Sequence, residues 1–256
     1  MDYRNIEVAR NNAVATVYFN RPDSLNSWNE ALVDELTNFL NDSKYDDNTK
    51  VIIITGKGRA FSVGGDLQEF LAFDAKGIER FNRKVIDLFR LMEHVRKPII
   101  AAVNGHCNLE IIQAADIVVA SNKAKFGLPE VNVAISPGAG ILVRLPRAVG
   151  KLKAKEIALL GEWMTADVAL SLGLVNRVES PEELMKKVEE ISFALAEKAP
   201  MAVGAIKAVV NNGSEMSIDE GMEYQLKENS SLFYTEDLKE GVKAFLEKRK
   251  ANYKGR

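Results

Sequence analysis

The chain has 256 residues, of which 46% are hydrophobic, and this is enough apolar material for a large core in one domain or two. The formal net charge of −2 gives no sign of general nucleic-acid binding, so no nucleic-acid partner is expected. The single cysteine, Cys107, excludes an internal disulfide and fits a reducing compartment. Together with only two histidines, His94 and His106, it makes no metal-binding cluster.

The two ends of the chain carry no targeting or membrane pattern. No apolar run approaches the ~18 residues that a membrane span needs, and the first residues lack the charged and then apolar order of a secretory signal. We therefore expect a cytoplasmic protein without a membrane partner.

The basic cluster Lys248-Arg249-Lys250, with Lys254, is interpreted as a solvated helix end or, less favoured, as a phosphate contact.

The first two thirds of the chain alternate between strand patterns and helix patterns. In chain order, the sequence predicts strands over 5–10 and 13–19 around an Asn11-Asn12 turn, a helix over 29–40, a strand over 51–55, a helix over 78–95, and strands over 99–103 and 117–120. Such alternation is typical of an α/β fold.

Strand patterns almost vanish after Lys151. Helices are predicted over 154–160, 165–172, 181–198, 202–211 and 217–229. Thr165 and Ser180 are suitable N-caps, and Gly173 is a suitable C-cap. We therefore divide the chain into an α/β core over 1–195 and a C-terminal helical region over 196–256.

The segment Gly64-Gly65-Asp66 follows a predicted buried strand. Its simplest interpretation is a tight turn with Asp66 as the N-cap of a helix. The same geometry leaves backbone N–H groups free at the positive end of a helix dipole, where they can stabilise an oxyanion.

Two glutamates follow predicted buried strands or turns. Glu110 comes after the turn Asn104-Gly105, and Glu130 comes after Phe126-Gly-Leu-Pro. Each also has an ordinary interpretation, Glu110 as a carboxylate at a helix N-terminus and Glu130 as a loop carboxylate near Lys125. The apolar neighbours of Glu110 favour desolvation and a raised pKa, which acid/base work on a carbon skeleton requires.

Several stretches resemble the crotonase superfamily, also called the enoyl-CoA hydratase/isomerase family. The matching segments are 51–67 with its Gly-Gly-Asp-Leu, 109–117 with Leu-Glu-Ile-Ile-Gln-Ala-Ala-Asp-Ile, and 124–138 with Phe-Gly-Leu-Pro-Glu and Pro-Gly. Weaker matches at Asn20-Arg-Pro22, 161–175 and 239–251 extend the resemblance over essentially the whole chain.

The resemblance implies a crotonase-like spiral of ββα repeats with a C-terminal helical region that forms a homotrimer or homohexamer. It implies an acyl-CoA thioester as substrate, with no metal and no cofactor, because CoA is part of the substrate. The favoured reaction adds water across C2=C3 of a trans-2-enoyl-CoA to give a 3-hydroxyacyl-CoA. The alternatives are an enoyl-CoA isomerase, another crotonase-type acyl-CoA enzyme, and a catalytically impaired CoA-binding member.

The resemblance also implies a role for individual residues. Glu130 delivers a proton to C2, Glu110 orients or deprotonates the water, and the N–H of Gly138 helps to hold that water. The N–H of Gly65 is one oxyanion donor. The residues that contact the substrate are Asn26, Ser62, Val63, Asp66, Leu67 and Gln68.

The chain departs from the family pattern between Gly105 and Glu110. The family has a longer connection with a run of glycines, whereas four residues without glycine stand here. By counting back from Glu110, Cys107 takes the place of the second oxyanion donor, and the N–H of Asn108 is the alternative. Because glycine permits a close backbone approach that cysteine does not, we expect the short connection to weaken activity. A His106–Cys107 nucleophile pair is disfavoured, because no third orienting group is evident.

Overall fold

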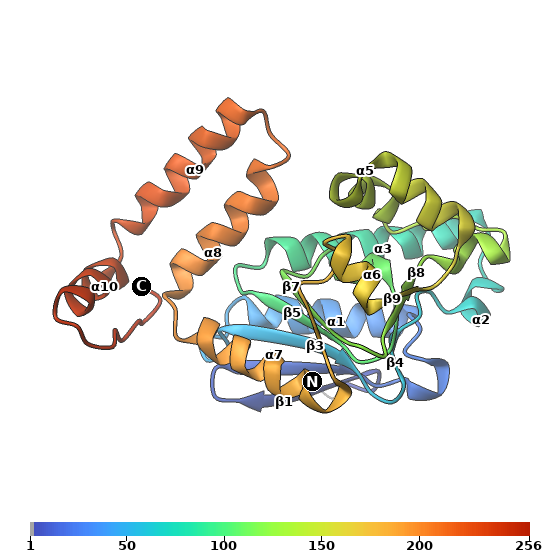
Figure 1. Cartoon of the computed structure of the whole chain (residues 1–256), viewed down its shortest axis with the longest axis horizontal. Helices are drawn as coiled ribbons and strands as arrows, with labels where there is room; N and C mark the ends of the chain where they lie inside the picture. The colour runs from blue at the N-terminus through green and yellow to red at the C-terminus, as the bar shows by residue number, and fades with distance from the viewer. Residues whose placement is uncertain (1–2) are drawn as a thin grey trace.

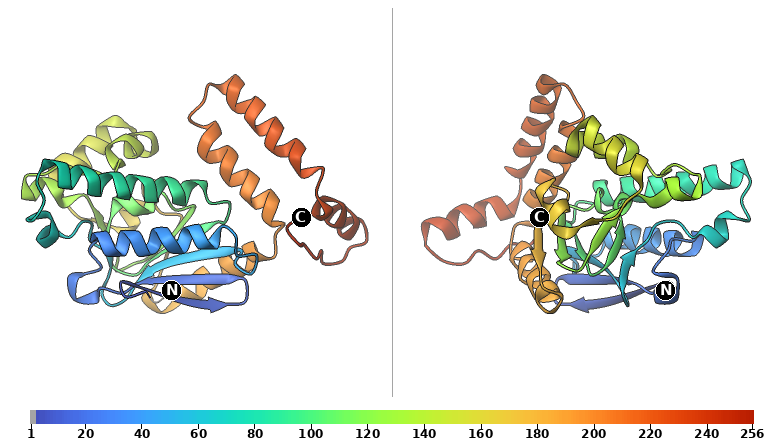
Figure 2. Two further views of the ribbon diagram at one scale, coloured as in Figure 1. Left: turned by 180° about the vertical axis from the view of Figure 1, so that it is seen from behind. Right: turned by 45° about the vertical axis from the view of Figure 1, so that its right-hand side comes forward.

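The structure is a computed structural model that describes residues 3–256. An α/β body is followed by a helical arm that projects from one side of it, as Figures 1 and 2 show. None of the helices in the described range is long and apolar enough to cross a membrane.

The larger sheet has six strands in the order β1-β2-β3-β5-β7-β10. Strands β1 (Ile6–Asn11) and β2 (Val14–Phe19) form the predicted antiparallel hairpin, in which Asn12 takes a φ of 52° at the turn. The strands that follow are β3 (Val51–Gly56), β5 (Ile99–Val103), β7 (Ile117–Ser121) and β10 (Arg177–Glu179), and they pair in parallel from β2 onward.

A smaller sheet has four strands in the order β4-β6-β8-β9. These are β4 (Ala60–Ser62), β6 (His106–Asn108), β8 (Lys125–Gly127) and β9 (Met164–Thr165). Each of β3, β5 and β7 in the larger sheet is followed at once by a short strand of the smaller sheet and then by a helix. The chain is therefore a spiral of ββα repeats, and the predicted fold class is confirmed.

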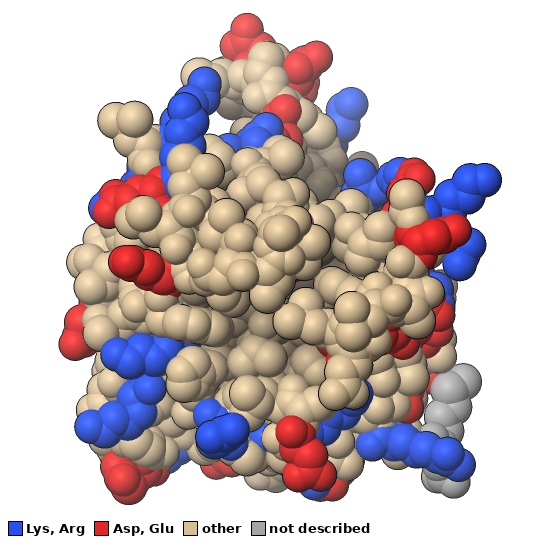
Figure 3. Space-filling view, turned by 90° about the vertical axis from the view of Figure 1, so that its right-hand side faces the viewer, with Lys and Arg blue, Asp and Glu red and all other residues tan. Residues whose placement is uncertain are grey.

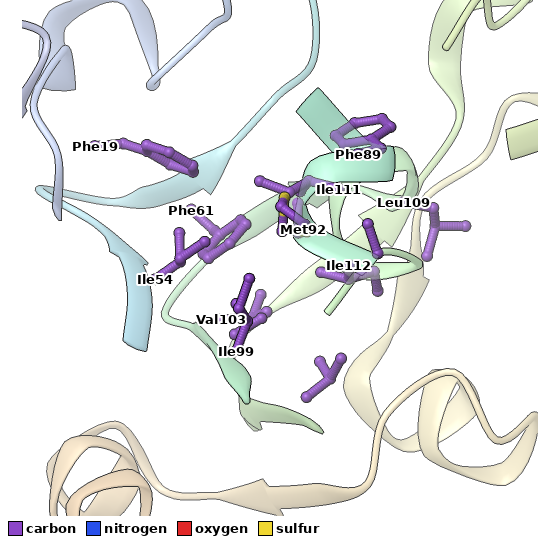
Figure 4. Packing of buried hydrophobic residues seen from close by; sticks show 14 of the residues in the cluster. Phe19, Ile54, Phe61, Phe89, Met92, Ile99, Val103, Leu109, Ile111 and Ile112 are labelled. Carbon is purple, nitrogen blue, oxygen red and sulfur yellow. The ribbon is translucent and has the colours of Figure 1, made fainter. Parts of the chain in front are cut away.

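Two layers of helix enclose the larger sheet. Helices α1 (Glu30–Ser43) and α3 (Ala75–His94) pack against one face, where the main core lies, and Figure 4 shows part of that core around Phe19, Phe61 and Phe89. Helix α7 (Pro181–Ala196) covers the other face through Leu184 and Val188. Strand β3 is buried along its whole length because both faces are covered.

The remaining elements of the body are short or interrupted. They are η1 (Pro22–Ser24), α2 (Leu67–Phe70), α4 (Leu109–Ile112), η2 (Pro129–Val133), α5 (Ile141–Leu160) and α6 (Ala166–Ser171). The sequence predicted only the last part of α5, residues 154–160, because Pro146 and Gly150 break its helical pattern. The helix does kink at Gly150, where φ is 77°.

The C-terminal arm consists of α8 (Pro200–Ala208), the π-helix η3 (Val209–Gly213), α9 (Ile218–Leu232) and α10 (Glu236–Leu246). The arm is tied to the body by Lys207, whose Nζ lies 2.7 Å from Asp116, and by an ion pair between Arg96 and Glu228 at 2.7 Å. The boundary placed at residue 195 falls at the C-terminal end of α7, and the division into two domains stays a prediction.

Two residues of the basic cluster beyond α10 form ion pairs with acidic neighbours. Arg249 pairs with Glu240 at 2.7 Å and also with Glu247, and Lys250 pairs with Glu197. These pairs agree with the interpretation of this cluster as a solvated helix end.

Candidate active site

A cavity of about 630 Å³ lies between the α2–α3 segment, the start of α4, and η2 with the loop that follows it. Most of its wall is apolar, with Phe70, Phe73, Ile78, Phe81, Val85 and Trp163 among the lining residues. Figure 3 shows the face that carries α2: uncharged residues occupy its middle, and most charged residues lie toward its margin. Glu110 and Glu130 both line this cavity.

Glu110 lies in the first turn of α4, directly after β6. The side chain of Asn108 caps this helix, because its Oδ1 accepts the N–H of Glu110 at 3.0 Å. The carboxylate Oε1 of Glu110 accepts the N–H of Ala139 at 3.0 Å. Burial, reinforced by the charge of Glu130, raises the pKa of Glu110 to about 7. The desolvation inferred from the apolar neighbours of Glu110 is thus present.

Glu130 lies in the first turn of η2, directly after Pro129. Its Oε1 accepts a hydrogen bond from Nδ2 of Asn108 at 2.7 Å. Its Oε2 is buried and has no hydrogen-bond partner within residues 3–256. Burial raises the pKa of Glu130, and the Asn108 hydrogen bond opposes that effect. The two glutamates therefore form a coupled carboxyl pair in a largely apolar cavity.

The glycine turn Gly64-Gly65 borders the same cavity. Two backbone hydrogen bonds hold this turn to Trp28, which lies just before α1. The Trp28 N–H donates to the Gly64 carbonyl at 2.8 Å, and the Asp66 N–H donates to the Trp28 carbonyl at 3.0 Å. The N–H of Gly65 has no acceptor within the described residues and is available to a ligand. A Cβ at residue 65 would lie 2.2 Å from Cζ of Phe70, so only glycine fits.

Gly138 lines the cavity beside the two glutamates, as the predicted site requires. Its Cα is covered by Asn82, because a Cβ there would lie 2.4 Å from the Asn82 Nδ2. Like that of Gly65, the N–H of Gly138 meets no acceptor in the part of the chain that the structure describes.

The predicted substrate-contact residues divide into two groups. Ser62, Val63 and Leu67 line the cavity. Asp66 caps α2, where its Oδ1 accepts the N–H of Gln68 at 3.0 Å, and neither residue is part of the cavity wall. Asp66 also pairs with Arg21 at 2.8 Å.

Asn26 is not brought to the cavity. It is fully buried, and its amide Nδ2 donates to the carbonyls of Lys57 and Ala60 at 2.9 and 2.8 Å. Its Oδ1 accepts the N–H of Arg21 at 2.9 Å. Both amide hydrogens are thus used inside the protein, where they join the segment between η1 and α1 to the β3–β4 turn.

Cys107 also lies outside the cavity wall. It is fully buried in β6 between Ser62 of β4 and Phe126 of β8, and burial raises the pKa of its thiol well above the usual range. The His106 ring instead stands edge-on to Trp163 at 5.2 Å. The side chains of His106 and Cys107 therefore do not face a common ligand, which agrees with disfavouring them as a nucleophile pair.

The side chain of Asn108 is part of the site, although the sequence analysis considers only its backbone N–H. Its signal was present, because an asparagine directly before an apolar helix is a typical N-cap. What the sequence did not show is that the same amide reaches Glu130, twenty-two positions further on.

Comparison with known proteins agrees with this geometry. The family model described as enoyl-CoA hydratase/isomerase matches residues 9–256. The chain is 38% identical to a crotonyl-CoA hydratase of Syntrophomonas wolfei, over 99% of both chains, and 36% identical to a short-chain-enoyl-CoA hydratase of Clostridium acetobutylicum, over 98% of this chain and 97% of the relative. A crystal structure of an enoyl-CoA hydratase from Bacillus anthracis superposes with a TM-score of 0.95 at 34% identity, over 99% of this chain and 100% of that one. The chain therefore belongs to the enoyl-CoA hydratase/isomerase family.

Proposed function

We propose that the protein is an enoyl-CoA hydratase that adds water across C2=C3 of a trans-2-enoyl-CoA to give a 3-hydroxyacyl-CoA. One observation carries the proposal: two carboxyl groups with raised pKa values and an unpartnered backbone N–H in a glycine turn border one largely apolar cavity. An enoyl thioester needs these three groups, because a proton, a base and an oxyanion donor must act on neighbouring atoms.

The thioester carbonyl accepts the N–H of Gly65, which polarises the conjugated double bond and stabilises the enolate oxygen that forms. Glu110 takes a proton from water while the water oxygen bonds to C3, and Glu130 gives its proton to C2. The N–H of Gly138 holds the water between them. The pair begins the turnover with one proton on Glu130 and ends it with one proton on Glu110, so a proton transfer back to Glu130 restores the starting state.

The second oxyanion donor is the weakest part of the proposed site. The sequence assigns it to the backbone of Cys107, or alternatively of Asn108. Cys107 is buried away from the cavity wall, whereas Asn108 lines it. We therefore propose the backbone of this short connection as a poor second donor and expect a slower hydratase than a family-length connection would support.

The acyl group fits the apolar part of the cavity. Phe70, Phe73 and Phe81 pack with ring centroids 5.3 to 6.0 Å apart, and all three line it. Since two relatives are named for crotonyl-CoA and for short-chain enoyl-CoA, we propose a short-chain trans-2-enoyl-CoA as substrate. A cytoplasmic location, a homotrimer or homohexamer, and no requirement for a cofactor complete the proposal.

The test is hydration of crotonyl-CoA, followed as the loss of absorbance of its conjugated thioester. We expect wild-type turnover to be lost in the double variant Glu110→Gln/Glu130→Gln, which keeps the shape of the pocket. Equilibrium binding of acetyl-CoA to that variant, measured by calorimetry, is the control for an intact site. A wild-type protein that binds acetyl-CoA and does not hydrate crotonyl-CoA contradicts the proposal.

A further inference from the structure

We infer that Asn108 is a positioning residue whose side-chain amide caps the helix that carries Glu110, holds the carboxyl group of Glu130 and determines which oxygen of Glu130 carries the transferable proton. This inference deepens the proposed function and rests on it. Asn108 lies at the junction of β6 and α4, in the connection that is shorter than in the family pattern.

The first step is the orientation of the amide. The backbone N–H of Glu110 is only a donor, so the Asn108 atom that faces it at 3.0 Å must be the carbonyl oxygen Oδ1. The NH₂ group is thereby directed toward Glu130, whose Oε1 lies 2.7 Å from Nδ2. A rotation of the amide by 180° about its χ2 axis would set two donors against each other at Glu110, which excludes the reversed arrangement.

The second step is the location of the proton. An amide NH₂ group has no acceptor, so the oxygen that it contacts cannot carry the proton in that hydrogen bond. When Glu130 is protonated, the proton therefore resides on Oε2, the oxygen without a partner in the described protein. The hydrogen bond also fixes the rotation of the carboxyl group, so that its acidic oxygen keeps one direction from turnover to turnover.

The third step is the room made for the amide. A Cβ at residue 64 would lie 2.8 Å from Nδ2 of Asn108, so a side chain at this position would push the amide from its place. Gly64 also has a φ of 96°, which side chains rarely adopt. The two glycines of the turn thus have different roles. Gly65 leaves its N–H free, and Gly64 leaves room for the Asn108 amide that donates to Glu130.

The experiment separates capping from the contact with Glu130. Asn108→Ser keeps a good N-cap for α4 and shortens the side chain so that it no longer reaches Glu130. Asn108→Asp keeps the cap and replaces the donor by a carboxylate that repels Glu130. We expect kcat to fall ~10- to 100-fold in the serine variant, with KM for crotonyl-CoA and the melting temperature close to wild type. The aspartate variant should be slower still, and its additional buried carboxylate should also lower the melting temperature.

A second readout does not depend on turnover. Loss of a donor to the carboxylate raises the pKa of Glu130, which can be measured by NMR of protein labelled with ¹³C at the glutamate carboxyl and assigned with Glu130→Gln. We expect that pKa to rise in Asn108→Ser. Unchanged kcat and unchanged titration in this variant would overturn the inference and leave the hydratase proposal intact. If Asn108→Ser shifts the titration of Glu130 but the wild-type protein has no hydratase activity, the contact is supported and the proposed function is rejected.

Discussion

At the scale of single residues, Glu130 is the group whose role can be tested most directly. Glu130→Gln keeps the size of the side chain and an oxygen that accepts the Asn108 hydrogen bond, but removes the proton that is to be transferred. We expect turnover of crotonyl-CoA to fall ~10²- to 10⁴-fold, with little change in KM. Steady-state kinetics measures both quantities, and a variant with intact turnover rejects Glu130 as the acid.

The coupled titration of the pair leads to a second prediction. The mechanism requires one proton on the two carboxyl groups, so kcat/KM should follow a bell-shaped pH profile. Activity falls at low pH when Glu110, the base, becomes protonated, and the pKa of about 7 for Glu110 places that limb near neutral pH. Activity falls at high pH when Glu130 loses the proton that it must donate, and burial raises the pKa of this group above its ordinary value.

The control for this profile is Glu110→Gln. It removes the base whose protonation gives the low-pH limb, so the residual activity should lose the bell shape and keep only the limb of Glu130. The profile is measured with crotonyl-CoA between pH 5 and 9, with thermal unfolding followed at each pH to exclude loss of fold. A flat profile in the wild-type protein contradicts the shared-proton mechanism.

At the scale of elements, the segment between Gly105 and Glu110, which forms β6 and the start of α4, is where we expect the chain to depart from the family pattern. Insertion of three glycines directly before Leu109 would lengthen this segment and supply the run of glycines that the family pattern has. We expect turnover to rise at least ~10-fold, because a glycine can present the second oxyanion donor at close approach. Affinity for acetyl-CoA should change little. If the longer protein is no faster, the short connection already supplies a competent donor.

The long elements could be predicted from the sequence because their patterns are strong. The hairpin at Asn11-Asn12, the β-branched run of β3 and the apolar stripe of α3 each fix one element by local chemistry. Strands β4, β6, β8 and β9 could not be predicted, since two or three residues carry no period. They form because their neighbours in the smaller sheet pair with them, and that information is not local.

The site divides in the same way. Glu110, Glu130, Gly65 and Gly138 were identified by resemblance, and the structure brings all four to one cavity. Asn26 was assigned to the substrate, but its amide joins two loops of the protein itself. The role of Asn108 depends on a contact between two repeats of the spiral, so no local pattern could have indicated it.

At the scale of the whole molecule, the C-terminal arm exposes more apolar surface than a free monomer usually shows. The side chains are spread over α8, α9 and α10 and the turns between them. Those more than half exposed include Ile206, Val210, Ile218, Met222, Leu226, Phe233, Phe245 and Leu246. The arm projects from the body in Figure 2, so the body of the same chain does not cover these residues. Exposed large apolar side chains gathered on one part of a chain are typical of a subunit interface.

We therefore expect the protein to assemble through α8–α10, with a solution mass three times the monomer mass of 28.3 kDa, or six times if two trimers associate. Light scattering at micromolar concentration measures this mass. Met222→Glu/Leu226→Glu places two charges on one face of α9, where burial against a partner would cost several kcal/mol per uncompensated charge, and should give monomers. Tyr45→Glu, at a side chain of the α/β body that is more exposed than Met222 and Leu226, is the control and should leave the mass unchanged. A wild-type mass of one chain removes the oligomerisation role from the arm. A charged α9 variant that still assembles places the interface elsewhere in the molecule.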